Sequence, residues 1–236
     1  MSHLLFDTPY TETPYTLLAY DEPAMIDNAS RMLSGDLDAL GMLTRISAIM
    51  GLGTRFTDTT HSGSMAEHQI SHYIDMFAGS QHPGSSHGEQ VGVGTITMSA
   101  LQNELVARET APVITPTVIP EAELHRRFGK DTATNMINET KKKAIDERMA
   151  DELNSRFERE WPSIREQLRA VMVPYDELRQ SMNDAGCAIT ASDLGLDGSF
   201  YRDAVTYARF IRDRFCVLDI VDDSIGLKRF VGAMEV

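Results

Sequence analysis

The sequence predicts an all-α fold, and three observations support this prediction. Apolar residues recur with a helical period through most of the chain, no alternating strand pattern is longer than a few residues, and no segment repeats. No glycine-rich turn follows a β-strand, and "GLGT" at 51–54 comes after a helical segment instead. The chain therefore has no dinucleotide-binding or P-loop fingerprint of its own.

Prolines divide the chain into parts. Pro9 and Pro14 prevent a long helix near the start, so this lead-in is expected to be irregular. Three further prolines in "APVITPTVIP" favour an extended connector in the middle of the chain. The predicted parts of a single helical domain are 1–22 (irregular), 23–108 (helices with the candidate site), 109–130 (proline-rich connector) and 131–236 (C-terminal helices).

Capping residues mark the helix ends. Pro23 suits the first turn of a helix and Gly35 its end, while Asp36 is a suitable N-cap for the next helix. The predicted helices cover 23–34, 37–53, 66–77, 87–108, a long charged segment 131–160 that Trp161-Pro162 ends, 163–172, 175–185 and 198–215.

The composition is acidic, with 35 Asp and Glu residues against 22 Lys and Arg residues and a net charge of −13. This balance argues against nucleic acid as the main partner, because binding a phosphate backbone needs a basic surface.

The lysine run 141–143 is expected on a solvated helix face. No apolar run is long enough to span a bilayer and no secretory leader is evident, so we expect a cytoplasmic protein. Cys187 and Cys216 have no metal or redox spacing and are expected to be buried free thiols.

The segment "AEHQISHYIDMF" at 66–77 separates two kinds of side chain. At 100° per residue its apolar residues share one face, which must pack on the core. His68, His72 and Asp75 fall on the opposite face, toward solvent or a cleft. Ser64 and Glu67 fit a capping box at the start of this helix. From His68 and His72 alone, two interpretations stay open: solvent-exposed surface residues, or part of a metal site.

The nearby run "SSHGEQVGVG" at 85–94 favours a site. Ser86 and Glu89 fit a second capping box, which puts His87 in the first turn of a helix. A cationic histidine is disfavoured there, whereas a neutral metal ligand is not. Gly88, Gly92 and Gly94 cost helix stability, so they indicate close approach of a ligand or of a neighbouring helix. Two neutral imidazoles with a carboxylate are a common catalytic set for zinc or a similar divalent metal.

Together, "SMAEHQISH" and "HGEQVGVG" resemble the helical metal-binding domain of the dehydroquinate synthase-like superfamily, which includes the iron-type alcohol dehydrogenases. Within it, the stretch 185–223, "AGCAITASDLGLDGSFYRDAVTYARFIRDRFCVLDIVDD", is similar to the tail of the glycerol-1-phosphate dehydrogenase branch. The resemblance covers most of the chain and is weakest in the connector and the charged helix. It implies a C-terminal, all-helical domain of a two-domain enzyme.

The resemblance also implies roles for particular residues. His68 and His87 match the two histidine ligands of the metal, and His72 matches the histidine that assists proton movement. The third ligand in the family is an upstream aspartate, and neither Asp7 nor Asp21 nor Asp27 stands in its context. The family's N-terminal α/β domain, which binds NAD(H) or NADP(H), has no counterpart here. We therefore expect a C-terminal part that holds metal weakly and is inactive alone.

The implied reaction is reduction of dihydroxyacetone phosphate to sn-glycerol-1-phosphate, with a small polyol phosphate as substrate. Many relatives have an arginine where this chain has His61, so His61 would meet the phosphate only as a point contact. Ser64 and Gln69 are further candidates for orienting the substrate.

Several alternatives stay open at this stage. The chain could belong to a metal-dependent dehydrogenase of an unphosphorylated polyol, or be a non-catalytic helical interaction module. A stand-alone metallohydrolase would need a further carboxylate or histidine ligand from within this chain, and Asp75 is the nearest candidate. The ligand set suits zinc, with nickel and iron(II) as alternatives, and the choice between NAD and NADP lies outside this segment. The oligomeric state is also open, with a homo-oligomer as one option.

Overall fold

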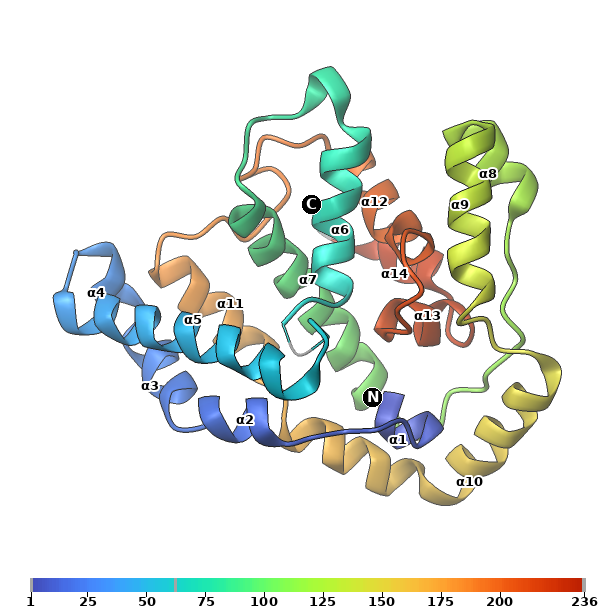
Figure 1. Ribbon diagram of the computed structural model, residues 1–236, viewed down its shortest axis with the longest axis horizontal. Coiled ribbons are helices and arrows are strands. Elements are labelled where there is room, and N and C mark those ends of the chain that lie inside the picture. Colours follow the sequence, from blue (N-terminus) through green and yellow to red (C-terminus); the bar gives the residue numbers. More distant parts are fainter. Residues whose placement is uncertain (1, 62, 235–236) are drawn as a thin grey trace.

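The computed structural model describes residues 2–61 and 63–234, and this part of the chain is helical without any β-strand. The prediction of an all-α fold is confirmed. The α-helices, numbered in chain order in Figure 1, are α1 (Ser2–Phe6), α2 (Thr13–Leu18), α3 (Asp21–Asp27), α4 (Ala29–Leu33), α5 (Leu37–Thr57), α6 (Ala66–Phe77), α7 (His87–Ala107), α8 (Glu121–Phe128), α9 (Lys130–Lys141), α10 (Glu147–Ala170), α11 (Tyr175–Asp184), α12 (Gly198–Tyr207), α13 (Val217–Asp222) and α14 (Leu227–Ala233). Two short 3₁₀ helices follow α6 and α12: η1 (Gly79–Gln81) and η2 (Ala208–Phe210), respectively.

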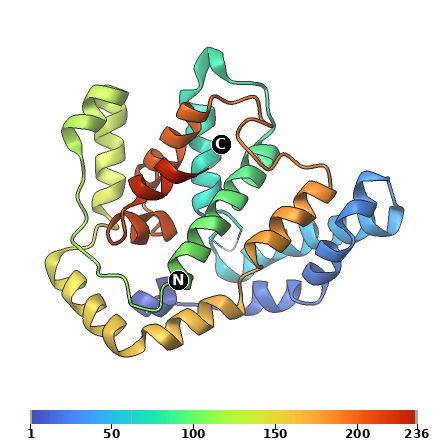
Figure 2. The same cartoon turned by 180° about the vertical axis from the view of Figure 1, so that it is seen from behind.

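Helices α6 and α7 cross at the centre of the molecule, with α2 to α5 extending as an arm on one side and α8 and α9 on the other (Figure 1). Seen from behind, α11 lies between the arm and α7, and α10 runs along one edge (Figure 2). A glycine explains how closely the two central helices approach. A Cβ at Gly94 would lie 2.9 Å from the Glu67 carbonyl oxygen and 3.2 Å from its Cα. The predicted close approach is therefore between α7 and the backbone of α6, and it positions the start of α7 against the histidine face of α6.

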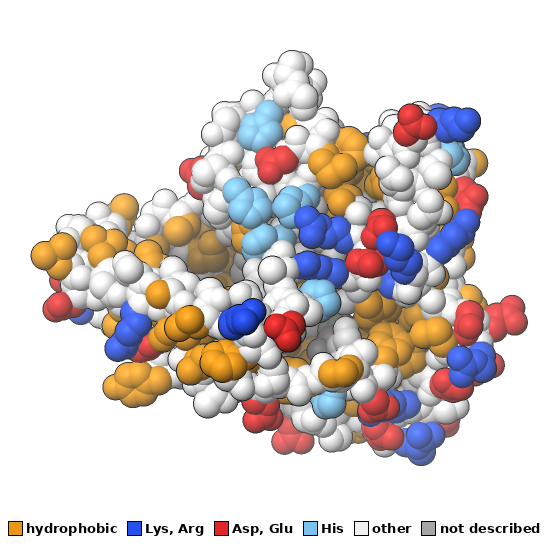
Figure 3. All heavy atoms as spheres, in the orientation of Figure 1, with side chains coloured by type: hydrophobic (Ala, Val, Ile, Leu, Met, Phe, Trp, Pro, Cys, Tyr) orange, Lys and Arg blue, Asp and Glu red, His pale blue; other side chains and the backbone are white. Residues whose placement is uncertain are grey.

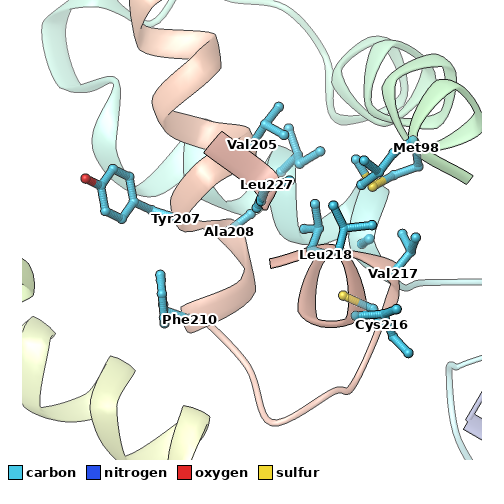
Figure 4. Packing of buried hydrophobic residues seen from close by; sticks show 14 of the residues in the cluster. Met98, Val205, Tyr207, Ala208, Phe210, Cys216, Val217, Leu218 and Leu227 are labelled. Atoms are coloured by element: carbon cyan, nitrogen blue, oxygen red, sulfur yellow. The ribbon is translucent and has the colours of Figure 1, made fainter. Parts of the chain in front are cut away.

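The apolar face of α6 packs into the core as predicted: Ile70, Tyr73 and Ile74 are almost fully buried. The core continues through the C-terminal helices, where Val205 and Ala208 lie near Leu218 and Leu227 (Figure 4). This core supports the segment between η2 and α13, which lies beside the site.

Several of the predicted segments are wrong. The predicted helix 23–34 is two helices, α3 and α4, separated at Asn28, whose side chain donates to the Ala24 carbonyl oxygen. The predicted helix 163–172 is the end of α10, the predicted helix 198–215 ends with η2, and the connector 109–130 contains α8.

The lead-in 1–22 contains the short helices α1 and α2 and the start of α3, because Pro14 is in the first turn of α2, where a missing N–H costs nothing. The charged segment is two helices, because Asp146 caps a new helix and its side chain accepts the Met149 N–H at 2.8 Å. That helix continues through Pro162, since Phe157 and Trp161 are buried on its inner face and hold it against the core.

The expectation that the lysine run is solvated is also wrong for one member. Lys141 and Lys142 are exposed, but the Lys143 side chain is only 4% exposed and its Nζ lies 2.9 Å from Asp219 Oδ1. Cys216 is buried as expected, whereas Cys187 is exposed. None of the helices in the described part is both long and apolar enough to cross a membrane.

Candidate metal and substrate site

Helices α6 and α7 bring the three predicted histidines together. The ring centroids of His68 and His87 are 5.1 Å apart, and those of His72 and His87 are 5.7 Å apart. All three side chains are at least partly exposed, as the helical periodicity predicts. Figure 3 shows histidines gathered on this face, with lysine or arginine side chains beside them.

The start of α6 differs from the prediction, because Ser64 and Glu67 do not form a capping box. The N-cap is Met65, without a side-chain cap. Glu67 Oε1 instead accepts from the Met65 N–H at 2.7 Å and from His68 Nδ1 at 2.9 Å. Burial raises the pKa of this carboxyl, but the hydrogen bonds outweigh burial and the net pKa is below its usual value. Glu67 is therefore an anion that orients the His68 ring.

His87 is oriented by a chain of hydrogen bonds from its own and the neighbouring helix. The buried Ser71 hydroxyl donates to Gln90 Oε1 at 2.7 Å, and its oxygen lies 2.8 Å from His87 Nδ1. The amide of Gln90 is oriented by its Nε2, which donates to Asp75 Oδ1 at 3.1 Å. Since the single hydroxyl proton of Ser71 is used, His87 Nδ1 must be the donor to Ser71. A neutral His87 then carries its lone pair on Nε2.

The same reasoning applies to His68, whose Nδ1 donates to a carboxylate. Within 2–61 and 63–234, Nε2 of neither His68 nor His87 has a hydrogen-bond partner. Metal-binding histidines typically donate their other N–H to a carboxylate or another oxygen in this way. The two residues therefore fit two ligand positions of a divalent metal.

A complete ligand set is not present in the described part of the chain, where no three His, Cys, Asp or Glu residues lie in a metal-binding arrangement. Asp75, the nearest candidate for the additional ligand that a stand-alone metallohydrolase would need, contacts His82 Nε2 at 3.2 Å and Gln90 instead. Any metal held by His68 and His87 would need a further ligand from elsewhere.

His72 lies at the other side of His87, next to an arginine. Arg212 Nη2 donates to His72 Nε2 at 3.2 Å, so a neutral His72 carries its proton on Nδ1. Burial, the positive charge of Arg212 and the neighbouring histidines lower the pKa of His72, and Asp75 only partly opposes them. The lowered pKa favours the neutral form of His72, which presents an Nδ1–H donor.

Sequence reasoning missed two arginines of this site. Arg212 and Arg214 follow η2 and reach the histidine face from a segment about 140 residues away along the chain. Arg214 Nη1 donates to the Ser64 carbonyl oxygen at 2.6 Å, and its Nη2 donates to Thr60 Oγ1 at 2.8 Å. No local pattern in "IRDRF" indicates this proximity, which depends on the packing of the C-terminal helices on α6.

The three predicted substrate-binding residues lie near these arginines. His61 is exposed, and burial together with the charge of Arg214 lowers its pKa. Ser64 Oγ is 3.3 Å from Arg214 Nη1. Gln69 is buried, with Nε2 3.5 Å from the Arg214 carbonyl oxygen and Oε1 without a partner in the described residues. Their roles toward a substrate stay predictions.

The second predicted capping box is present and gives a stability prediction. Ser86 Oγ accepts the Glu89 N–H, and the Glu89 side chain accepts the Ser86 N–H at 2.7 Å. Ser86→Ala should lower the free energy of unfolding by about 1 kcal/mol, because it removes the side-chain half of the cap. Urea unfolding measures this loss. Ser192→Ala, an exposed serine in a turn, is the control, and equal losses in both variants would contradict the prediction.

Comparison with known proteins identifies the class of protein that the chain resembles. No protein-family model matches it. The curated proteins that match are dehydrogenases, and all five carry the name glycerol-1-phosphate dehydrogenase (NAD(P)+). The chain is 22% identical to the protein of Haloquadratum walsbyi, over 92% of this chain and 43% of that protein.

Two other relatives come from Methanosphaera stadtmanae, at 26% identity, and Halalkalibacterium halodurans, at 28% identity; each matches 43% of this chain. The chain spans less than half the length of the curated relatives it matches. The resemblance to the glycerol-1-phosphate dehydrogenase branch is thereby confirmed.

Proposed function

We propose that this chain is the helical metal- and substrate-binding part of an NAD(P)-linked dehydrogenase that reduces dihydroxyacetone phosphate to glycerol-1-phosphate. The main support is the geometry of His68 and His87. Both rings are fixed through Nδ1, their centroids are 5.1 Å apart, and neither Nε2 has a hydrogen-bond partner among residues 2–61 and 63–234. The names of the curated relatives support the reaction and its cofactor.

A divalent metal bound by His68, His87 and a further ligand would polarise the substrate carbonyl as a Lewis acid. In the overall reaction, reduced nicotinamide donates hydride to the ketone carbon, and the ketone oxygen takes up one proton. His72 is placed to hydrogen-bond this oxygen through Nδ1–H, and it can pass on that proton only as its other nitrogen takes one up from solvent. Solvent would restore the proton after each turnover.

The protein that contains this chain together with its NAD(P)-binding part should oxidise NADH or NADPH when dihydroxyacetone phosphate is added. Unphosphorylated dihydroxyacetone should be a much poorer substrate if the phosphate contributes binding. Absorbance of the reduced nicotinamide measures both rates. Preference for the unphosphorylated ketone would favour a polyol dehydrogenase, and no turnover of either ketone would favour a non-catalytic module.

Replacing His72 tests its role separately. His72→Asn should lower kcat roughly 100-fold, which is the usual contribution of a positioned proton donor, and should leave metal binding nearly unchanged. The matched control is His125→Asn, because His125 is exposed and is carried by another helix, α8. An unchanged kcat in His72→Asn would remove His72 from the mechanism.

A further inference from the structure

The segment between η2 and α13 delivers two positive side chains to the histidine face. Arg212 contacts His72, and Arg214 contacts Ser64 and Thr60 at the start of α6. Neither guanidinium lies within 4.0 Å of a carboxylate among residues 2–61 and 63–234; the carboxylate of Asp213, between them in the sequence, lies 3.9 Å from Lys142 Nζ. Two neighbouring cations without a carboxylate partner in the described part of a chain of net charge −13 are a local site for an anion.

The guanidinium groups keep donors for such an anion. Arg212 uses one N–H for His72, and Arg214 uses both terminal nitrogens for oxygens of the α6 start. Each guanidinium has five N–H groups, so both retain donors that no described residue accepts. Both side chains are only partly buried, so an entering ligand can reach them.

The backbone of the segment that carries the arginines is held by hydrogen bonds from Lys143. Lys143 Nζ donates to the carbonyl oxygens of Arg209 at 2.7 Å and Arg214 at 3.1 Å, and it also pairs with Asp219. Phe215, next to Arg214, packs edge-on against Phe6. The backbone of the arginines is therefore fixed before a ligand binds, which reduces the entropic cost of binding.

We propose that Arg212 and Arg214 form the subsite for the phosphate group of the substrate. This inference rests on the proposed function and specifies its substrate class as a phosphomonoester dianion. The planar fork of a guanidinium matches two phosphate oxygens, which a single histidine cannot do. The arginines would thus provide the recognition for which the sequence offers only His61. They are binding residues, whereas His72 is placed to move a proton.

Binding of sn-glycerol-1-phosphate to the chain tests the proposal without hydride transfer. Calorimetric or NMR titration should show that Arg212→Gln and Arg214→Gln each weaken binding roughly 10- to 100-fold, because each removes charge-assisted hydrogen bonds. Arg212→Lys and Arg214→Lys should recover only part of the affinity, since they keep the charge and lose the fork. Helix content by circular dichroism shows whether each variant is folded, and the lysine variants provide the test if a glutamine variant is not.

Arg148→Gln is the matched control, because Arg148 is a largely exposed arginine of α10 that pairs with Glu152. Glycerol should bind equally weakly to all variants. Equal binding of sn-glycerol-1-phosphate by the wild type and the double variant Arg212→Gln/Arg214→Gln, including no binding by either, would overturn the proposal. ADP serves as a probe for the diphosphate of the cofactor. The proposal would also be overturned if the arginine variants bound ADP more weakly than the wild type but bound sn-glycerol-1-phosphate equally well. Failure of the dehydrogenase assay alone would contradict the proposed function and not this subsite.

Discussion

His87→Ala should weaken binding of Zn²⁺ or Co²⁺ to the chain by at least roughly 100-fold, because losing a direct ligand costs more than losing its hydrogen-bond partner. His68→Ala should have an effect of the same size, since the two imidazole rings are neighbours with centroids 5.1 Å apart. Calorimetry with Zn²⁺ and the visible spectrum of bound Co²⁺ measure this affinity without any enzyme activity. The wild type should bind one ion.

Replacing a hydrogen-bond partner of a histidine, rather than the histidine itself, should have a smaller effect on metal affinity. Ser71→Ala removes the acceptor for His87 Nδ1 and should weaken metal binding roughly 10- to 100-fold, while the helix content stays unchanged. His125→Ala serves as the control for a histidine far from the site. If His68→Ala and His87→Ala both retain the wild-type affinity, the paired histidines are surface residues and the proposed metal site is wrong.

The helices of the site could be predicted because local chemistry determines them. The apolar period of α6, the capping box at Ser86 and the N-cap at Asp36 are all contained in short windows of sequence. The predictions failed where tertiary packing overrides local preference. Pro162 is inside α10 because buried aromatic residues beside it stabilise the helix, and Lys143 is buried because a distant aspartate pairs with it.

The site divides in the same way. The spacing of His68, His72 and His87 on two consecutive helices made their proximity predictable. Arg212 and Arg214 come from the far end of the chain, so their approach depends on how α12 and η2 pack on α6, and no local pattern indicates it. Ser64 was expected to cap α6, but the guanidinium of Arg214 makes the contact instead.

A buried ion cluster connects these distant parts and carries the largest stability prediction. Arg209 is 1% exposed and donates to three carboxylates, with Nε 3.1 Å from Asp219 Oδ1 and Nη2 3.1 Å from Asp223 Oδ1; Nη1 bonds Asp222. Removing one partner of a buried ion cluster leaves the other charges uncompensated in a low-dielectric interior. This typically lowers the free energy of unfolding by about 3–5 kcal/mol. The cluster also includes Lys143, which holds the arginine segment of the site.

Arg209→Met should therefore lower the free energy of unfolding by about 3–5 kcal/mol in urea titrations. Arg229→Met is the control, because this exposed arginine pairs only with Glu104 and should cost no more than about 1 kcal/mol. Losses of similar size in the two variants would contradict the structural role of the cluster.

The loss in Arg209→Met should also depend on pH, with a sign that follows from Asp223. Burial raises the pKa of this carboxyl in the folded state, although Arg209 and a hydrogen bond from Thr117 oppose burial. A raised folded pKa means that the group favours folding below its unfolded pKa and that this contribution is lost as the pH rises through the folded value. The variant lacks the opposing charge of Arg209, so its folded pKa lies higher still. The destabilisation should hence be larger at about pH 8 than at about pH 4.5, and the reverse order would contradict compensation of the Asp223 charge by Arg209.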